Sequence, residues 1–151
     1  MTTDSAPDVR RTYRAVPPML DLPAMEHEIL DFWAANDTFS ASLRRTEGGR
    51  PWTFYEGPPT ANGMPGTHHI EARVFKDVFP RFKTMQGFHV DRKAGWDCHG
   101  LPVELAVEKE LGFNGKPDIE AYGVEAFNAK CRASVSRHVD AFTELTHRMG
   151  Y

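Results

Sequence analysis

Hydrophobic positions repeat with helical spacing in several stretches of the chain, and two short apolar runs lie between them. Apolar residues three and four positions apart predict one buried face of a helix, whereas a short run bounded by turn residues predicts a strand. Helices are predicted to begin at Asp21-Leu22-Pro23 and to cover 70–85, 103–111, 118–122 and 124–149. Strands are predicted at 52–56 and 88–94. This alternation predicts an α/β fold.

The succession of strand, helix and strand over 52–94 predicts one βαβ unit. Such a unit has parallel strands and a right-handed crossover. Two strands do not make a stable open sheet by themselves. We therefore expect the chain to be part of something longer, with sheet edges that are exposed when it stands alone.

Composition narrows the class of protein. The 151 residues suffice for one domain, and a hydrophobic content of 40%, a charged content of 26% and a net charge of −3 are those of an ordinary globular protein. No apolar run reaches the ~20 residues that span a bilayer, so no membrane partner is expected. Cys98 and Cys131 make no disulfide framework, which favours the cytoplasm. Residues 1–20 show no periodicity and are interpreted as a flexible arm before a domain at 21–151.

The first candidate site lies between the strand at 52–56 and the following helix. Gly57-Pro58-Pro59 opens this loop, and Gly66-Thr67-His68-His69 closes it. Glycines let a ligand approach the backbone, and a helix N-terminus attracts anions, so the two imidazoles can donate hydrogen bonds to phosphate. The alternative is that Thr67 caps the helix and both histidines are solvated.

The second candidate site follows the strand at 88–94, in Gly95-Trp96-Asp97-Cys98-His99-Gly100. Asp97 can bind an ammonium group, with Trp96 packed beside it. Alternatively, Asp97 caps the next helix and Trp96 belongs to the core. No metal site, and no zinc, is expected because the cysteines and histidines lack metal-ligand spacing.

Taken together, these loops resemble isoleucyl-tRNA synthetases, which are class I aminoacyl-tRNA synthetases. The resemblance is carried by Gly-Pro-Pro-Thr-Ala-Asn-Gly, by the histidine tetrapeptide, by Gly-Trp-Asp-Cys-His-Gly-Leu-Pro-Val-Glu104, and by segments at 28–37 and 121–132. It implies that 21–151 is the first βαβ half of a Rossmann-like (HUP-type) catalytic domain with added helices, which ends before the editing insertion. The implied reaction is activation of isoleucine by ATP to isoleucyl-adenylate, followed by transfer to tRNA(Ile).

The resemblance also assigns roles to individual residues. Gly57, Pro58, Trp96 and Asp97 match the amino-acid site, where Asp97 receives the substrate α-amino group. The ATP site is matched by Asn62, Gly63, Gly66, Thr67, His68 and His69, of which His68 and His69 are the expected catalytic residues. The usual signature is His-x-Gly-His, so the first and third positions are exchanged here, and a local rearrangement is expected.

The resemblance implies isoleucine, ATP with Mg²⁺, and tRNA(Ile) as partners of a full-length ligase that is expected to be a monomer. The oligomeric state of this chain does not follow from its sequence. A Lys-Met-Ser-Lys-Ser-type loop is absent, so the chain alone is expected to be inactive. Two alternatives stay open: a nucleotidyltransferase, and a non-catalytic binding module derived from a synthetase.

Overall fold

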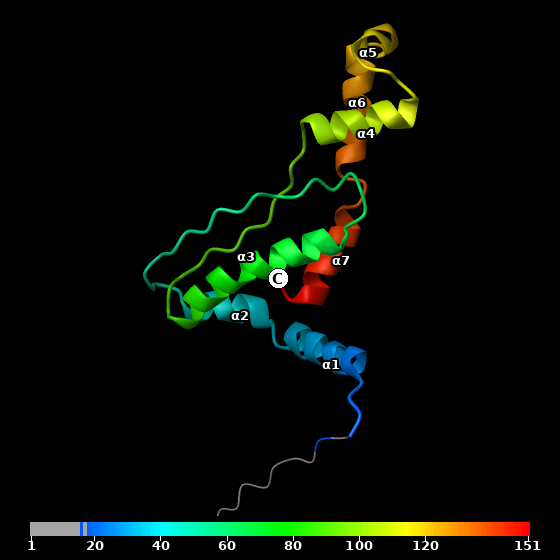
Figure 1. The fold of residues 1–151 in the computed structure, drawn as a ribbon. Helices are drawn as coiled ribbons and strands as arrows, with labels where there is room; N and C mark the ends of the chain where they lie inside the picture. Colours follow the sequence, from blue (N-terminus) through cyan, green and yellow to red (C-terminus); the bar gives the residue numbers. More distant parts are fainter. Residues whose placement is uncertain (1–15, 17) are drawn as a thin grey trace, which may run out of the picture.

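In the computed structural model of the protein, residue 16 and residues 18–151 are described. Most of the predicted arm at 1–20 therefore lies outside the described residues. Within them the chain forms seven helices, which Figure 1 labels: α1 (Leu22–Ala35), α2 (Thr38–Arg45), α3 (Thr67–Met85), α4 (Leu101–Leu111), α5 (Lys116–Tyr122), α6 (Val124–Val135) and α7 (Val139–Met149). None of these helices is both long and apolar enough to cross a lipid bilayer.

The predicted start of α1 is confirmed. The Asp21 carboxylate accepts a hydrogen bond from the Ala24 N–H at 3.1 Å, the usual N-cap interaction. The separate helix α2 was not predicted. It begins after Asp37, which has a φ of 46°, and the Asp37 carboxylate accepts from Ser40 at 2.7 Å. The left-handed backbone of Asp37 turns the chain between the two helices.

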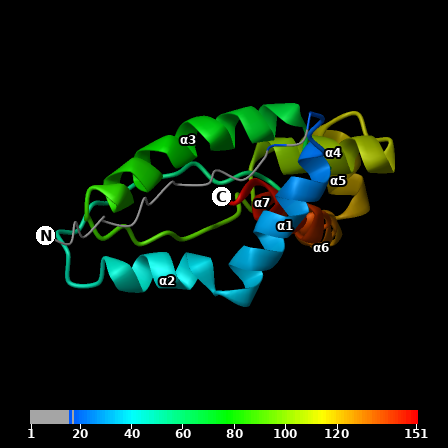
Figure 2. The same ribbon diagram turned by 90° about the horizontal axis from the view of Figure 1, so that it is seen from below.

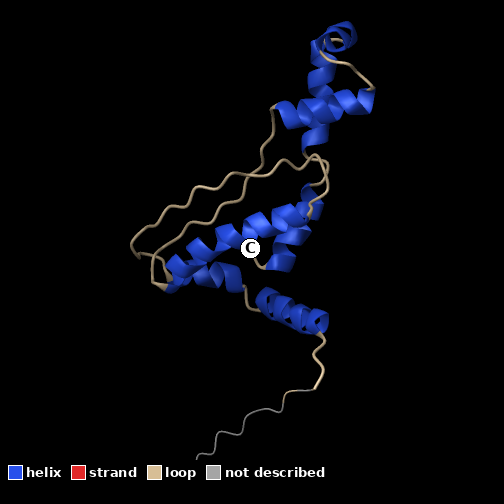
Figure 3. Cartoon of the chain, in the orientation of Figure 1, coloured by secondary structure: helices blue, strands red, loops and turns tan. Residues whose placement is uncertain are grey.

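The two predicted strands are extended segments rather than hydrogen-bonded strands, and no strand forms in the described residues (Figure 3). The segments run parallel and meet in one isolated bridge between Pro51 and His89. A regular ladder from this bridge would bring the Asp97 N–H to the Pro58 carbonyl. The observed bond goes to the Pro59 carbonyl, at 3.0 Å. The first segment thus has one extra residue between the two contacts, where its prolines have no N–H to donate.

Helix α3 connects the two segments, as predicted, and runs beside them along the outer edge of the molecule in Figure 2. The buried residues of α3 are Arg73 and Pro80. Its predicted apolar stripe faces outward instead: Val74, Val78 and Phe82 remain 53%, 57% and 51% exposed. In this structure the crossover helix is therefore held by contacts other than its apolar face.

The predicted single helix over 124–149 is wrong, because the chain breaks it into α6 and α7. Ser136 ends α6, and the N–H of His138 donates to the carbonyl of Ala61 at 2.9 Å. Ala61 is fully buried. The break exchanges helical hydrogen bonds for a tertiary one, and it brings α7 against the loop that precedes α3.

Helices α4, α5 and α6 form a separate unit at one end of the molecule (Figure 1). The predicted α4 is confirmed, with Pro102 in its first turn. Val103, Val107 and Phe127 are buried in this unit. Because α4 follows the loop that carries Asp97, this unit anchors the far end of the second candidate loop.

Candidate active site

The ring of His69 is held at the first turn of α3. The backbone N–H of Gly66 donates to His69 Nδ1 at 3.0 Å, and the N–H of His69 donates back to the Gly66 carbonyl at 3.0 Å. This is the half of a capping box in which a side chain at the third helical position satisfies the N-cap amide. The geometry gives His69 one orientation and leaves its Nε2 edge uncommitted to the backbone.

His68 packs against both of its neighbours in the tetrapeptide. Its ring lies 3.9 Å, between centroids, from the ring of His69. A Cβ atom placed on Gly66 would stand 3.0 Å from Cε1 and Nδ1 of His68. The imidazole of His68 thus fills the space beside Gly66. A side chain at residue 66 would meet this ring, which explains why glycine suits that position.

Phe142 of α7 connects the two candidate loops. This side chain is fully buried. The ring of His69 meets it edge-on at 4.9 Å, and the ring of Trp96 does so at 5.7 Å, both between centroids. The histidine loop and the tryptophan loop therefore share one apolar support.

Asp97 is tied to the Gly-Pro-Pro loop through the backbone. Its N–H donates to the carbonyl of Pro59, and Gly95 lies close to Pro58, since a Cβ on Gly95 would be 3.9 Å from the Cβ of Pro58. The Asp97 carboxylate is half-buried and accepts a long bond of 3.5 Å from the His99 N–H. It forms no salt bridge with a residue that the structure describes.

Asn62, Gly63 and Thr67, the other residues predicted to bind ATP, do not lie in the same kind of environment. The Asn62 amide donates to the Pro102 carbonyl at 3.2 Å, so it joins the loop to α4. Gly63 and Thr67 are exposed. Asn62 thus links the first candidate loop to the helix that follows the second, a role that the sequence prediction did not include.

The charge on His69 is set by its surroundings. Burial is the main cause that lowers the pKa of His69, and the positive charges of His68 and Arg73 act in the same direction. The ring therefore favours its neutral form more than a solvated histidine does.

Comparison with known proteins decides the family. The sequence model of class I tRNA synthetases (I, L, M and V) matches residues 28–151. The chain belongs to the class I tRNA synthetase family.

Three curated relatives are each much longer than this chain. An isoleucine–tRNA ligase of Cutibacterium acnes is 79% identical over 93% of the chain and 13% of that protein. The one from Thermobifida fusca is 69% identical over 93% of the chain and 13% of its own length. The one from Dehalococcoides mccartyi strain 195 is 52% identical over 92% of the chain and 14% of its own length. The chain thus spans about an eighth of the length of the relatives it matches.

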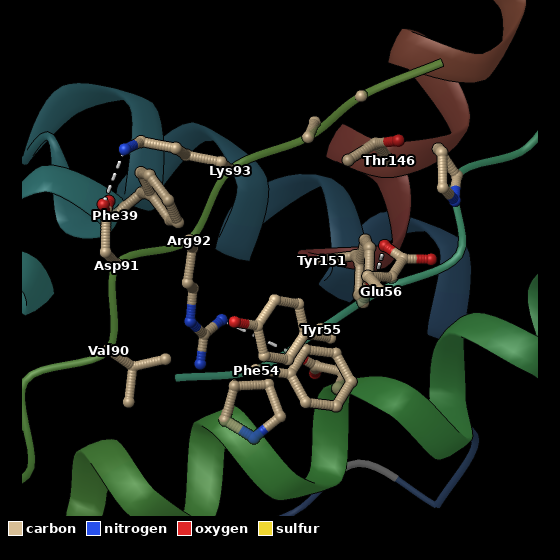
Figure 4. A pocket seen from close by; sticks show the side chains of 15 residues that line it. Phe39, Phe54, Tyr55, Glu56, Val90, Asp91, Arg92, Lys93, Thr146 and Tyr151 are labelled. Carbon is tan, nitrogen blue, oxygen red and sulfur yellow. Dashed lines mark hydrogen bonds and ion pairs between the residues drawn. The ribbon is translucent and has the colours of Figure 1, made fainter. Parts of the chain in front are cut away.

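This synthetase chain also encloses a cavity that the sequence did not predict (Figure 4). It has a volume of about 320 Å³ and lies between the two extended segments, α2, α3 and α7. Of the predicted site residues, Pro58 alone lines it. The cavity lies beside the part of the two segments in which no parallel ladder forms.

A polar cluster of Glu56, Lys76 and Tyr151 lies next to the Gly-Pro-Pro loop, and Glu56 and Tyr151 also line the cavity. The Glu56 carboxylate accepts from Lys76 at 2.5 Å and from the Tyr151 hydroxyl at 3.0 Å. Lys76 also donates to the Gly57 carbonyl at 3.1 Å. Burial, followed by the hydrogen bond to Glu56, raises the pKa of Tyr151. The cluster joins the first segment to α3 and to Tyr151.

Sequence reasoning missed three residues that support the site: Phe142, Arg73 and Glu56. Phe142 belonged to the predicted apolar stripe of the last helix, but that pattern does not say which loops the ring will meet. Glu56 was the last residue of the predicted strand at 52–56 and Arg73 lay within the predicted helix at 70–85, and neither was assigned a contact. Only the packing of α7 against α3 reveals what they contact.

Proposed function

We propose that this chain supplies the first part of the catalytic domain of an isoleucine–tRNA ligase. The whole enzyme would activate isoleucine with ATP to isoleucyl-adenylate and pyrophosphate, and would then transfer the isoleucyl group to tRNA(Ile). The proposal rests on the agreement between the names of the relatives and the arrangement of the two loops. Relatives up to 79% identical bear this name, and the loops that resemble the amino-acid and ATP motifs share one support, Phe142.

On this proposal, the histidine tetrapeptide binds the phosphates of ATP. His69 and His68 would donate hydrogen bonds to α-phosphate oxygens, where negative charge grows as the isoleucine carboxylate attacks and pyrophosphate leaves. Gly66 and Thr67 would admit ATP to the backbone at the start of α3, with Asn62 and Gly63 in the loop before it. Support comes from the fixed ring of His69 and from its neutral form, which suits a donor.

The amino-acid side of the site would be formed by the second loop and the Gly-Pro-Pro wall. Asp97 would accept hydrogen bonds from the α-ammonium group of isoleucine, with Trp96, Gly57 and Pro58 around the substrate. Two observations support this role. The carboxylate of Asp97 is half-buried, and its backbone is bonded to that of Pro59. Positioning of the two substrates then supplies much of the rate enhancement.

The remaining partners follow from the same proposal. The described residues contain no group of three or more His, Cys, Asp or Glu side chains that could hold a metal ion. We therefore expect Mg²⁺ to arrive on the ATP phosphates, as this ion commonly does. We expect the enzyme to work in the cytoplasm and as a monomer.

We also propose that the segments at 52–56 and 88–94 become the first two strands of a Rossmann-like sheet when the rest of the catalytic domain is present. The parallel bridge between Pro51 and His89 supports this, because it already sets the direction of the pair. On this view 21–151 is the N-terminal half of the catalytic domain.

The ATP assignment is tested with His69→Ala in the full-length ligase that contains this chain. Loss of one donor to transition-state charge lowers rates by roughly 10²–10³, and we expect that loss in ATP–pyrophosphate exchange. His147→Ala, an exposed histidine of α7, is the control and should exchange at the wild-type rate. Unaltered exchange in the His69 variant would contradict the assignment.

The amino-acid assignment is tested with Asp97→Asn in the same enzyme. Replacing the charge that faces the ammonium group should raise KM for isoleucine much more than KM for ATP, as steady-state exchange kinetics would measure. If a substrate without an α-amino group were activated and Asp97→Asn had no effect, the chain would instead belong to a nucleotidyltransferase. The 151-residue chain by itself should show little or no exchange, which separates it from the complete enzyme.

A further inference from the structure

The ring of His69 is bound at one nitrogen by a group that can only donate. A backbone N–H has no acceptor function, so Nδ1 of His69 must accept the 3.0 Å bond from Gly66. An accepting Nδ1 carries no proton, and the hydrogen of the neutral ring is then on Nε2. No other hydrogen bond from a residue that the structure describes reaches this ring. The Nε2–H is therefore free to donate to a ligand.

Arg73 stands one helical turn after His69 on α3 and is only 8% exposed. Its Nη1 atom donates to the Thr146 hydroxyl at 2.6 Å. Its guanidinium lies 5.5 Å from the centroids of both the Phe142 and the Tyr151 rings. It forms no salt bridge with a carboxylate among the described residues. The positive charge of Arg73 is thus fixed in place and not neutralised by a local carboxylate.

The groups that face His69 all oppose a second proton on its ring. On α3 these are the imidazole of His68 and the guanidinium of Arg73, which both lower the pKa of His69. From α7 the contact is the apolar ring of Phe142, which meets His69 at 4.9 Å. Protonation of Nδ1 would also set two hydrogens against each other at the Gly66 amide. Charge, burial and hydrogen bonding therefore favour the same neutral form.

We propose that the Gly66 amide and Arg73 are positioning groups that present His69 to an ATP phosphate as a neutral Nε2–H donor. The identity of the ligand rests on the proposed function, whereas the state of the ring does not. A histidine that acts as a cation loses its charge near its ordinary pKa of about 6.5. His69, as a neutral donor, keeps the same hydrogen through neutral and alkaline pH. Arg73 acts through His69 and does not itself touch the substrate.

The ring state is measured by long-range ¹H–¹⁵N NMR on the complete 151-residue chain without nucleotide, with His69→Asn used to assign the signals. Near neutral pH we expect an unprotonated Nδ1 and a protonated Nε2. A ring protonated on Nδ1, or on both nitrogens, would overturn the proposal.

The part played by Arg73 is tested with matched variants followed by NMR titration. Arg73→Met removes the charge and should raise the pKa of His69, whereas Arg73→Lys keeps the charge and should leave that pKa low. Thr146→Val removes the shorter of the two hydrogen bonds of Arg73 but not the charge, so it controls for loss of a contact. An unchanged pKa in Arg73→Met would overturn the role of Arg73. Circular dichroism would show whether Arg73→Met is folded. If it is not, a raised pKa of His69 in folded Arg73→Lys would equally overturn the role of Arg73.

The ATP assignment of His69 and the neutral state of its ring can each be disproved without the other. The NMR measurement contains no ATP, so it tests the ring of His69 whatever the ligand is. The exchange assay with His69→Ala tests the ATP site whatever the protonation state of the ring. In the full-length enzyme, wild-type exchange that persists as pH rises through about 6.5 supports both proposals. A loss of exchange over that range contradicts the neutral donor.

Discussion

The unit formed by α4, α5 and α6 and the region around α3 and α7 are stabilised in different ways. In the first, apolar side chains pack on one another: Val103, Val107 and Phe127 are 2%, 2% and 4% exposed. Their contacts join elements that are close in sequence. This unit therefore has a small hydrophobic core of its own.

The region around α3 and α7 relies much more on polar links between distant residues. Lys76 reaches Glu56, and Arg73 reaches Thr146. The buried ring of Phe142 is its apolar centre, while much of the apolar face of α3 is exposed. The candidate catalytic histidines lie in this second region.

The difference shows that the α4–α6 unit has a hydrophobic core of its own, whereas much of the apolar face of α3 is left uncovered by the described residues. Val74, Val78 and Phe82 are about half exposed, so this helix face provides only part of the ~1.5–3 kcal/mol that full burial of each such side chain would give. The α3 region is therefore expected to be the less stable of the two. Its charged contacts hold the site geometry despite this, and four measurements test the contrast.

The largest effect is expected for Phe142→Ala, because it removes the one ring that both candidate loops contact. Phe→Ala changes in cores cost about 3–5 kcal/mol, and urea unfolding should show a loss of that size. Phe127→Ala should cost a similar amount but leave the NMR signals of His69 unchanged. Equal perturbation of His69 by both variants would mean that the two regions are not independent.

A smaller loss is expected for Lys76→Met, which removes the ammonium group from the half-buried carboxylate of Glu56. Hydrogen bonds to charged groups contribute about 1.5–3 kcal/mol. Lys93→Met is the matched control, because the Lys93–Asp91 pair is exposed and exposed ion pairs add little to stability. If denaturant unfolding gave the same loss for both lysines, the polar links would not stabilise the α3 region.

Acid should weaken the α3 region through His69. Its pKa is lowered in the folded protein, so the unfolded chain takes up the proton first as pH falls. Stability is then complete above about pH 6.5 and decreases as pH falls from there toward the folded-state pKa. Unfolding measured against pH in wild type and in His69→Asn checks this, and a wild-type profile that matches the variant would refute it.

The smallest effect is expected on the exposed face of α3. Phe82→Gln should change the free energy of unfolding by no more than about 0.5 kcal/mol, as surface substitutions usually do, because half of this side chain is already in water. Sedimentation should show less self-association of the variant at high concentration. A loss of several kcal/mol would mean that this face is covered in solution.

The helices that could be predicted were those with strong local signals. Asp21 and Pro23 mark the start of α1, and Gly112 follows the end of α4. The division of 124–149 into α6 and α7 could not be predicted, because Ser136 to His138 contain no glycine or proline. The carbonyl of Ala61, which accepts the N–H of His138, is distant in sequence.

The candidate site, like the helices, was predicted only where local signals were strong. The loops and their chemistry were evident in the order of residues, because glycine, proline, histidine and aspartate have distinctive local properties. The contact of both loops with Phe142 was not, because an apolar stripe does not name its partner. The two strands were predicted from short apolar runs bounded by turn residues, yet the two segments meet in one isolated bridge and form no ladder.

Local preference and side-chain chemistry determined, without any structure, where most helices start, which loops carry polar groups and which family the motifs resemble. Tertiary structure alone decided that α7 separates from α6, that Phe142 lies beneath His69 and Trp96, and that Arg73 is buried. The reason is physical. Capping and periodicity act over one or two helical turns, whereas these contacts join groups far apart in the chain and exist only after the backbone has closed the loop between them.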